Sequence, residues 1–187
     1  RFFESGTMTM TDVVPTFSPS MDIQISSNFE RLLFDLYDRN GVTLADAMTA
    51  FRSTGTLKVG ANALAGVRAL FDAGRVDDHG TLAAIADCRR RLGETIDPHT
   101  AVGYVVAQQH RRDPAIPMVV LATAHPAKFP DAVEKATGVR PPLPGRLGDL
   151  MDRAERVDGL RNDVDELKSM IDQRRAMAVA PATRSKV

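Results

Sequence analysis

The stretch PMVVLATAHPAKF, from Pro117 to Phe129, decides the fold class. Its apolar run, residues 118–122, is typical of a strand that is buried on both faces, as strands are in parallel sheets. Polar residues follow at once, with Thr123 at the carboxyl end of the strand, where open α/β sheets bind their ligands. An ordinary strand-to-helix turn would use similar residues. The stretch therefore predicts a parallel α/β sheet and marks one candidate site.

Helical spacing dominates the part of the chain that precedes this stretch. Capping patterns at Ser27 and Thr43 predict the first turns of two helices. Two further helices follow, and Asp77 or Asp78 is expected to cap the second of them. Apolar residues recur at helical spacing through all four segments. Residues 29–92 are therefore expected to form a helical block with short connections.

The remaining segments are shorter. Residues 7–15, TMTMTDVVP, alternate Thr with Met and predict a short strand that ends at Pro15. Pro98 suits the first turn of another helix, and Gly138 is expected to end the next one. A last helix is predicted from Asn162. Together with the buried run, this pattern predicts an α/β chain that is rich in helices.

The composition argues against several classes of protein. Lys+Arg and Asp+Glu both number 24, so the net charge is zero, whereas nucleic-acid binding requires a basic excess on one face. The single cysteine, Cys88, excludes a disulfide framework and fits a reducing compartment. No apolar run reaches the length of a membrane span. These features predict a cytoplasmic protein with no nucleic-acid or membrane partner.

The histidines do not predict a metal site. They lack both the i,i+4 pairing and the supporting cysteines that metal ligands show; they are His79, His99, His110 and His125.

The segment DPHTAVG, residues 97–103, is a stronger candidate for a site. It places Asp97, His99 and Thr100 at the start of a helix, where backbone N–H groups and the helix dipole favour an anion or a polar ligand. Capping of the helix explains the same residues equally well. The sequence leaves both interpretations open.

Three motifs, taken in order, resemble one protein family. They are SPSMDIQISSNFERLLFDLY (residues 18–37), DPHTAVG, and VVLATAHPAKFPDAVEKATG (residues 119–138), and the likeness continues through residues 143–163. In this order they resemble the C-terminal part of long-type threonine synthases. The resemblance implies the C-terminal portion of a pyridoxal 5'-phosphate (PLP) enzyme of fold type II, similar to tryptophan synthase β, with a few parallel-sheet strands.

The resemblance also implies an activity. Enzymes of this family convert O-phospho-L-homoserine and water to L-threonine and phosphate. Their Schiff-base lysine lies in a Ser-Phe-Lys-Asp motif and their phosphate loop reads Gly-Asn-Phe-Gly, and neither motif occurs in this chain. We therefore expect a C-terminal piece that holds no catalytic residue of its own. Its expected partner is the N-terminal part of the same enzyme, without which it would be inactive.

The resemblance assigns roles to particular residues. Thr123 is expected to face the pyridine nitrogen of the cofactor. The segment with Asp97, His99 and Thr100 is expected to lie beside the cofactor ring, because it is similar to a Glu-Pro-X-X-Ala segment of related enzymes. His125 and Lys128 are expected to bind the substrate phosphate or carboxylate, although a structural role fits them as well. Residues 18–22 are expected to line the cleft.

The same comparison divides the chain into expected parts. Residues 1–25 would be a strand and loop of the catalytic domain, 26–95 the helical block, 96–174 the strand and helices that complete the cofactor domain, and 175–187 a disordered tail. A dehydratase acting on threonine or serine fits less well, because such relatives lack the SPSMDIQ and AHPAKF forms. The alternative from another class is a non-catalytic helical binding module, which the helical block would support.

Overall fold

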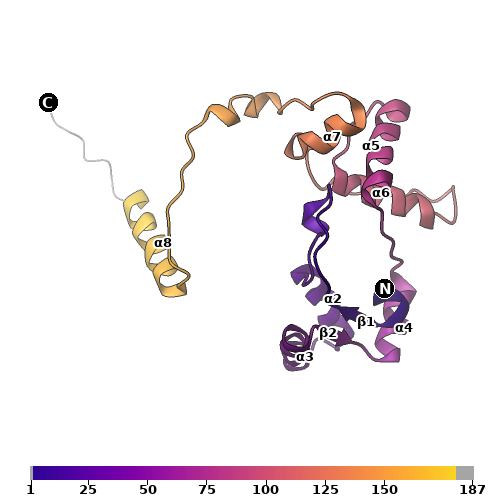
Figure 1. The fold of residues 1–187 in the computed structure, drawn as a ribbon. Coiled ribbons are helices and arrows are strands. Elements are labelled where there is room, and N and C mark those ends of the chain that lie inside the picture. Colours follow the sequence, from indigo (N-terminus) through magenta and orange to yellow (C-terminus); the bar gives the residue numbers. More distant parts are fainter. Residues whose placement is uncertain (1, 180–187) are drawn as a thin grey trace. The chain divides into compact units, whose positions relative to one another are not determined.

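A computed structural model describes residues 2–179 of the chain (Figure 1). The chain divides into two compact units, Arg1–Leu143 and Pro144–Val187. The described residues confirm a helix-rich chain with few strands. They hold one sheet, which has two strands. In the part that is described, no helix is long and apolar enough to cross a membrane.

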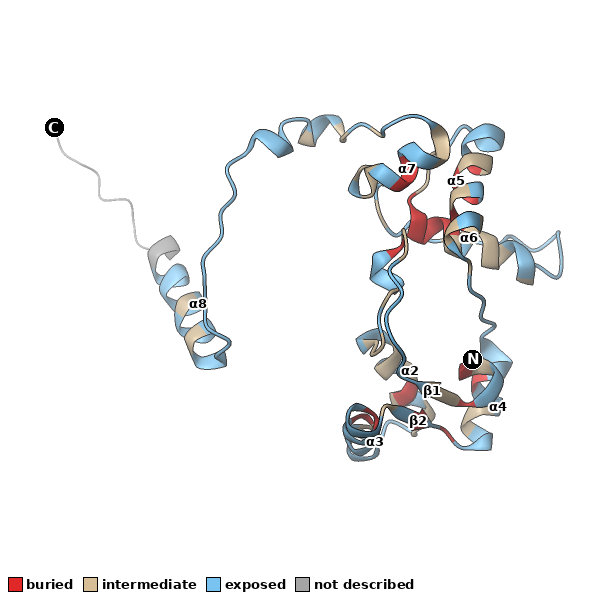
Figure 2. Cartoon of the chain, viewed as in Figure 1, coloured by how far each residue is buried: buried red, intermediate tan, exposed pale blue. Residues whose placement is uncertain are grey.

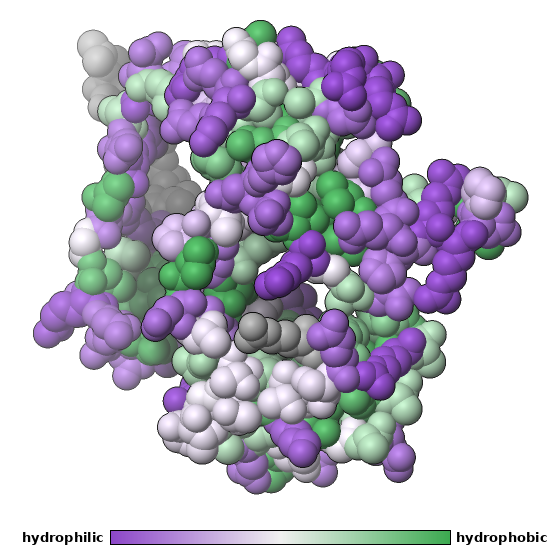
Figure 3. All heavy atoms as spheres, turned by 45° about the vertical axis from the view of Figure 1, so that its right-hand side comes forward, coloured by the Kyte–Doolittle hydropathy of each residue, from purple (hydrophilic) through white to green (hydrophobic). Residues whose placement is uncertain are grey.

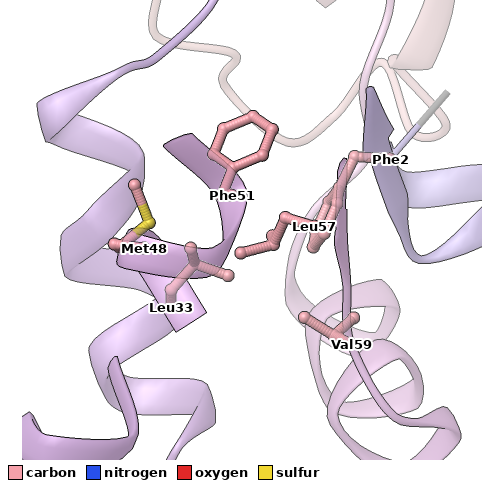
Figure 4. Packing of buried hydrophobic residues seen from close by; sticks show 6 residues of the cluster. All are labelled: Phe2, Leu33, Met48, Phe51, Leu57 and Val59. Atoms are coloured by element: carbon pink, nitrogen blue, oxygen red, sulfur yellow. The ribbon is translucent and has the colours of Figure 1, made fainter. Parts of the chain in front are cut away.

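The first group of elements in the larger unit builds a hydrophobic core around the sheet. It consists of α1 (Phe2–Ser5), β1 (Thr7–Thr9), α2 (Ser27–Leu36), α3 (Gly41–Thr54), β2 (Thr56–Lys58) and α4 (Ala61–Leu70). The strands β1 and β2 pair antiparallel, with Met8 opposite Leu57. Figure 4 shows the buried side chains that fill this core: Phe2, Leu33, Met48, Phe51, Leu57 and Val59.

The helix starts in this group differ from the predicted ones. Ser26, rather than Ser27, caps α2 by accepting a hydrogen bond from the Phe29 amide. Asn40, rather than Thr43, caps α3, and the amide of Thr43 is the donor to its side chain. In both cases an earlier residue has the extended backbone and the side-chain acceptor that an N-cap requires.

The second group of elements surrounds a smaller core. It consists of α5 (Asp78–Leu92), α6 (Pro98–His110) and α7 (Pro130–Thr137), with short 3-10 turns at η1 (Pro19–Met21) and η2 (Pro126–Lys128). Ala84 and Ile85 of α5 pack against Ala101 of α6. Asp77 caps α5, and α6 begins at Pro98 as predicted. Gly138 ends α7 in the left-handed conformation, also as predicted.

The predicted buried strand is wrong for this structure. Residues 118–122 have no regular secondary structure, and Val119 and Leu121 are 79% and 75% exposed. A strand forms only when a neighbour pairs with its backbone, and no described segment pairs with this one. The parallel sheet is therefore not found in the described residues, where the one sheet is antiparallel. The predicted strand at residues 7–15 is also shorter than expected, since β1 ends at Thr9.

The smaller unit is mostly exposed (Figure 2). It contains η3 (Gly145–Leu147), η4 (Leu150–Asp152) and α8 (Val164–Val179). The Asp163 carboxylate accepts hydrogen bonds from the amides of Asp165 and Glu166, so the helix begins close to its predicted start. The prediction of a disordered tail is wrong for residues 175–179, because the helix α8 continues to Val179. The rest of that tail, residues 180–187, lies outside the described residues.

Candidate functional site

A fully buried carboxylate lies at the centre of the candidate site. Asp97 is 0% exposed and is the N-cap residue of α6. Its Oδ1 accepts hydrogen bonds from the amide and from Nδ1 of His99, both at 2.9 Å. Its Oδ2 accepts from the amide of Thr100 at 3.4 Å and from the Thr100 hydroxyl. Four donors therefore serve one carboxylate, which offsets the cost of burying its charge.

His99 extends this arrangement to a distant segment. Its Nε2 accepts a hydrogen bond from the amide of Ser20 at 3.1 Å. A backbone amide can only donate, so Nε2 carries no proton, and Nδ1 donates its proton to Asp97. The ring of His99 also packs on Phe129, with 4.5 Å between the ring centroids. His99 is therefore a neutral imidazole that joins α6 to the loop around Ser20.

Thr100 makes the corresponding connection on the other side. Its hydroxyl donates to the Asp97 carboxylate and accepts a hydrogen bond from the amide of Thr123 at 3.1 Å. The backbone of Thr123 is thus held against the first turn of α6. Thr123 itself is exposed, and no described residue forms a hydrogen bond with its hydroxyl. The structure therefore brings Asp97, His99, Thr100 and Thr123 together.

His125 and Lys128 follow this cluster in sequence, His125 as the N-cap residue of the turn η2 and Lys128 as its last residue. The Nδ1 of His125 accepts a hydrogen bond from the amide of Ala127 at 3.1 Å, so the neutral ring carries its proton on Nε2. Both side chains are exposed. The Lys128 ammonium forms no ion pair with a described residue. The two residues present donors to solvent close to Thr123 in sequence, and neither contacts Asp97.

Further contacts anchor the loop at residues 18–22. The Asp22 carboxylate accepts from the amide of Thr16 at 2.7 Å and from its hydroxyl at 2.9 Å. The amide of Phe17 donates to Asp78 at 3.0 Å, and the Phe17 ring lies 4.9 Å from the Lys135 ammonium. Sequence reasoning missed Thr16 and Asp78. The signal for Asp78 was the pair Asp77-Asp78, of which only one residue can cap α5.

The described residues contain no group of three His, Cys, Asp or Glu side chains that could hold a metal ion. The groups at the site are hydroxyls, a neutral imidazole and backbone amides around the Asp97 carboxylate, whose two oxygens already accept four hydrogen bonds.

Comparison with known proteins gives the family. A family profile described as "Threonine synthase, C-terminal" matches residues 100–171. Threonine synthase from Pseudomonas aeruginosa is 45% identical over 174 residues, which cover 92% of this chain and 37% of that protein. This chain is related to the C-terminal part of threonine synthases. Threonine synthase from Corynebacterium glutamicum is 40% identical, with 91% of this chain and 37% of the relative covered.

Solved threonine synthase structures share the fold. The PLP-bound threonine synthase from Brucella melitensis superposes with a TM-score of 0.78 at 43% identity, covering 92% of this chain and 37% of that one. The yeast threonine synthase gives a TM-score of 0.74 at 30% identity, covering 94% and 40%. The chain therefore spans less than half the length of the threonine synthases that it matches.

Proposed function

We propose that this chain is the C-terminal part of a cytoplasmic threonine synthase that converts O-phospho-L-homoserine and water to L-threonine and phosphate. The observation that carries the proposal is the cluster around Asp97. Hydrogen bonds from the backbone amides of Ser20 and Thr123 connect this cluster to the other two motifs. The threonine synthase resemblance places all three motifs at the cofactor cleft. The solved relative from Brucella melitensis binds PLP, and PLP, when bound, acts as an electron sink at the substrate.

The donor groups at the site fit a neutral pyridine ring. The Thr123 hydroxyl has no hydrogen-bond partner among the described residues and can donate to the ring nitrogen. A carboxylate in that place would instead keep the ring nitrogen protonated. Asp97 is not available for that role, because four donors already occupy its two oxygens. We therefore propose that the Thr123 hydroxyl donates the hydrogen bond to the ring nitrogen.

His125 and Lys128 are proposed to bind the anionic groups of the substrate. Lys128 supplies a cation and His125 an Nε2–H donor, and both follow Thr123 within five residues. A phosphate or carboxylate is recognised by such charge-assisted donors. This chain would contribute binding groups only. The lysine that carries the cofactor would come from the N-terminal part of the enzyme.

Exposed apolar residues support such an N-terminal partner. Four apolar side chains in or near residues 118–122 are exposed: Ile116 (63%), Met118 (46%), Val119 (79%) and Leu121 (75%). Figure 3 shows one face of the molecule, where some apolar side chains lie at the surface. Residues 118–122 carry the pattern of a buried strand but have no pairing strand in the described residues. We infer that a strand of the N-terminal part pairs with them and covers these side chains.

Substitution of Thr123 in the complete enzyme tests the proposal. Thr123→Val keeps the shape but removes the hydroxyl, and an unsatisfied buried polar group costs about 1–3 kcal/mol. Cofactor affinity or turnover should then fall roughly ten- to a hundredfold, at tenfold per ~1.4 kcal/mol. Thr123→Ser should retain most activity, and Thr123→Asp should shift the cofactor absorbance by protonating the ring.

His125→Ala is the matched control, because it should impair substrate binding but leave the cofactor spectrum unchanged. Cofactor titration and steady-state kinetics on each variant give the answer. Wild-type behaviour of Thr123→Val in both measurements would refute the assignment.

A further inference from the structure

Two chains of hydrogen bonds, called arms below, lead from the Asp97 carboxylate to backbone amides of distant segments. One arm runs from Oδ1 through the His99 ring to the amide of Ser20, which lies 79 residues from His99 along the chain. The other arm runs from Oδ2 through the Thr100 hydroxyl to the amide of Thr123, which lies 23 residues from Thr100. Both arms therefore begin at the Asp97 carboxylate.

The members of the arms are too deeply buried to meet a ligand themselves. Asp97, His99 and Thr100 are 0%, 7% and 5% exposed, in the buried first turn of α6 (Figure 2). Every nitrogen and oxygen of the three side chains already has a protein partner. Any effect of these residues on a ligand must therefore act through the segments that they hold.

We propose that Asp97, His99 and Thr100 are positioning residues that set the loop at residues 18–22 and the backbone of Thr123 in a fixed relation across the cofactor site. This inference rests on the proposed function for the identity of the ligand, but not for the network itself. Both arms depend on one proton arrangement, with the His99 proton on Nδ1 and the Thr100 proton directed at Asp97. The Asp97 carboxylate fixes both proton positions, because an ionised carboxylate can only accept hydrogen bonds.

Asp97→Asn tests the dependence on a carboxylate at constant size. The amide group offers one oxygen and one NH₂ group, so it can serve as the acceptor for only one arm. In whichever orientation it adopts, its NH₂ group faces a backbone N–H, that of His99 or that of Thr100, and the side chain of one arm loses its acceptor. We expect hydrogen–deuterium exchange at Ser20 or at Thr123 to become roughly tenfold faster or more, given the usual cost of an unsatisfied buried group.

Single-arm variants separate the two connections. His99→Phe keeps a ring against Phe129 but removes both nitrogens, so it should accelerate exchange at Ser20 and leave Thr123 protected. Thr100→Val should accelerate exchange at Thr123 and leave Ser20 protected, and Thr100→Ser should restore wild-type exchange. Thr137→Val is the control, because the Thr137 hydroxyl likewise accepts from a backbone amide, that of Val139 at 3.2 Å, outside the network.

The measurement is exchange resolved to single amides in the complete enzyme with PLP, together with the absorbance of the bound cofactor. Thr100→Val should shift that absorbance, Thr100→Ser should restore it, and Thr137→Val should leave it unchanged. Accelerated exchange with an unaltered spectrum supports the network while contradicting the role of Thr123 in the proposed function. Wild-type exchange at both Ser20 and Thr123 in Asp97→Asn, His99→Phe and Thr100→Val overturns the inference.

Discussion

Asp97 combines a helix cap with hydrogen bonds to two neighbouring side chains. The sequence DPHTAVG was equally consistent with helix capping and with a ligand site, and the structure shows that Asp97 does cap α6. The cap does not exclude a role in the site, because the same carboxylate also fixes His99 and Thr100. Capping preferences concern neighbours within three residues. The partners Ser20 and Thr123 lie much farther along the chain, so local sequence rules could not predict them.

Cys88 offers a prediction at the same scale. Burial raises the pKa of the Cys88 thiol, and the nearby carboxylates of Glu94 and Asp87 raise it further. Because the thiolate is the reactive form, we expect the folded chain to react with a disulfide reagent at pH 8 at least about tenfold more slowly than the chain in urea. Equal rates in the two states would contradict the buried position of Cys88.

The raised thiol pKa also has a consequence for stability. The unfolded thiol ionises near pH 8.5, by its usual value. Above that pH the folded state binds more protons than the unfolded state, so the free energy of unfolding should decrease as the pH rises. Cys88→Ala should remove this part of the pH dependence, which urea unfolding at pH 7 and pH 9 can detect.

At the scale of elements, the sequence predicted the existence of helices better than their first residues. All four helices expected between residues 29 and 92 are present, and Gly138 ends α7 with a φ of 72°. The N-cap residues are Ser26 and Asn40 instead of Ser27 and Thr43, because Ser26 and Asn40 offer side-chain acceptors earlier in the chain. Apolar periodicity records which face is buried, and it carries little information about where the first turn begins.

The adjacent carboxylates Asp77 and Asp78 have separable functions at the start of α5. Asp77 accepts from the amide of Gly80 at 2.8 Å, whereas Asp78 accepts from the amide of Phe17 at 3.0 Å. Asp77→Ala should lower the free energy of unfolding by about 1 kcal/mol through loss of the cap. Asp78→Ala should keep the cap but accelerate hydrogen exchange at Phe17. If the two variants gave the same exchange pattern, Asp78 would have no separate role in holding the loop.

At the scale of the whole molecule, the failed strand prediction is informative. Residues 118–122 have the composition of a buried strand, and Val120 lies on the side of α6, where a side chain at Gly103 would meet it. Its two neighbours in sequence, Val119 and Leu121, are exposed. The segment thus has the apolar sequence of a strand, but no described strand pairs with it. Sequence periodicity predicts which side chains need burial, but a strand also requires a second backbone to pair with.

This arrangement predicts how the chain behaves with and without its proposed partner. With PLP and borohydride, none of its five lysines should be labelled stoichiometrically in the chain alone, and no threonine should form. Addition of the N-terminal part of the enzyme should restore both cofactor binding and activity. Stoichiometric labelling of Lys128 in the isolated chain would contradict this prediction and would make Lys128 the cofactor-carrying lysine.

A charge placed on the exposed strand pattern tests where the two parts meet. Leu121→Asp puts a carboxylate where we expect a pairing strand to cover the side chain, and burying an unpaired charge is strongly unfavourable. The affinity between the two parts should therefore fall at least about a hundredfold, equivalent to ~2.7 kcal/mol. Leu70→Asp is the matched control, since Leu70 is 80% exposed on α4. Equal affinities for the two variants, measured by titration calorimetry, would place the contact elsewhere on the chain.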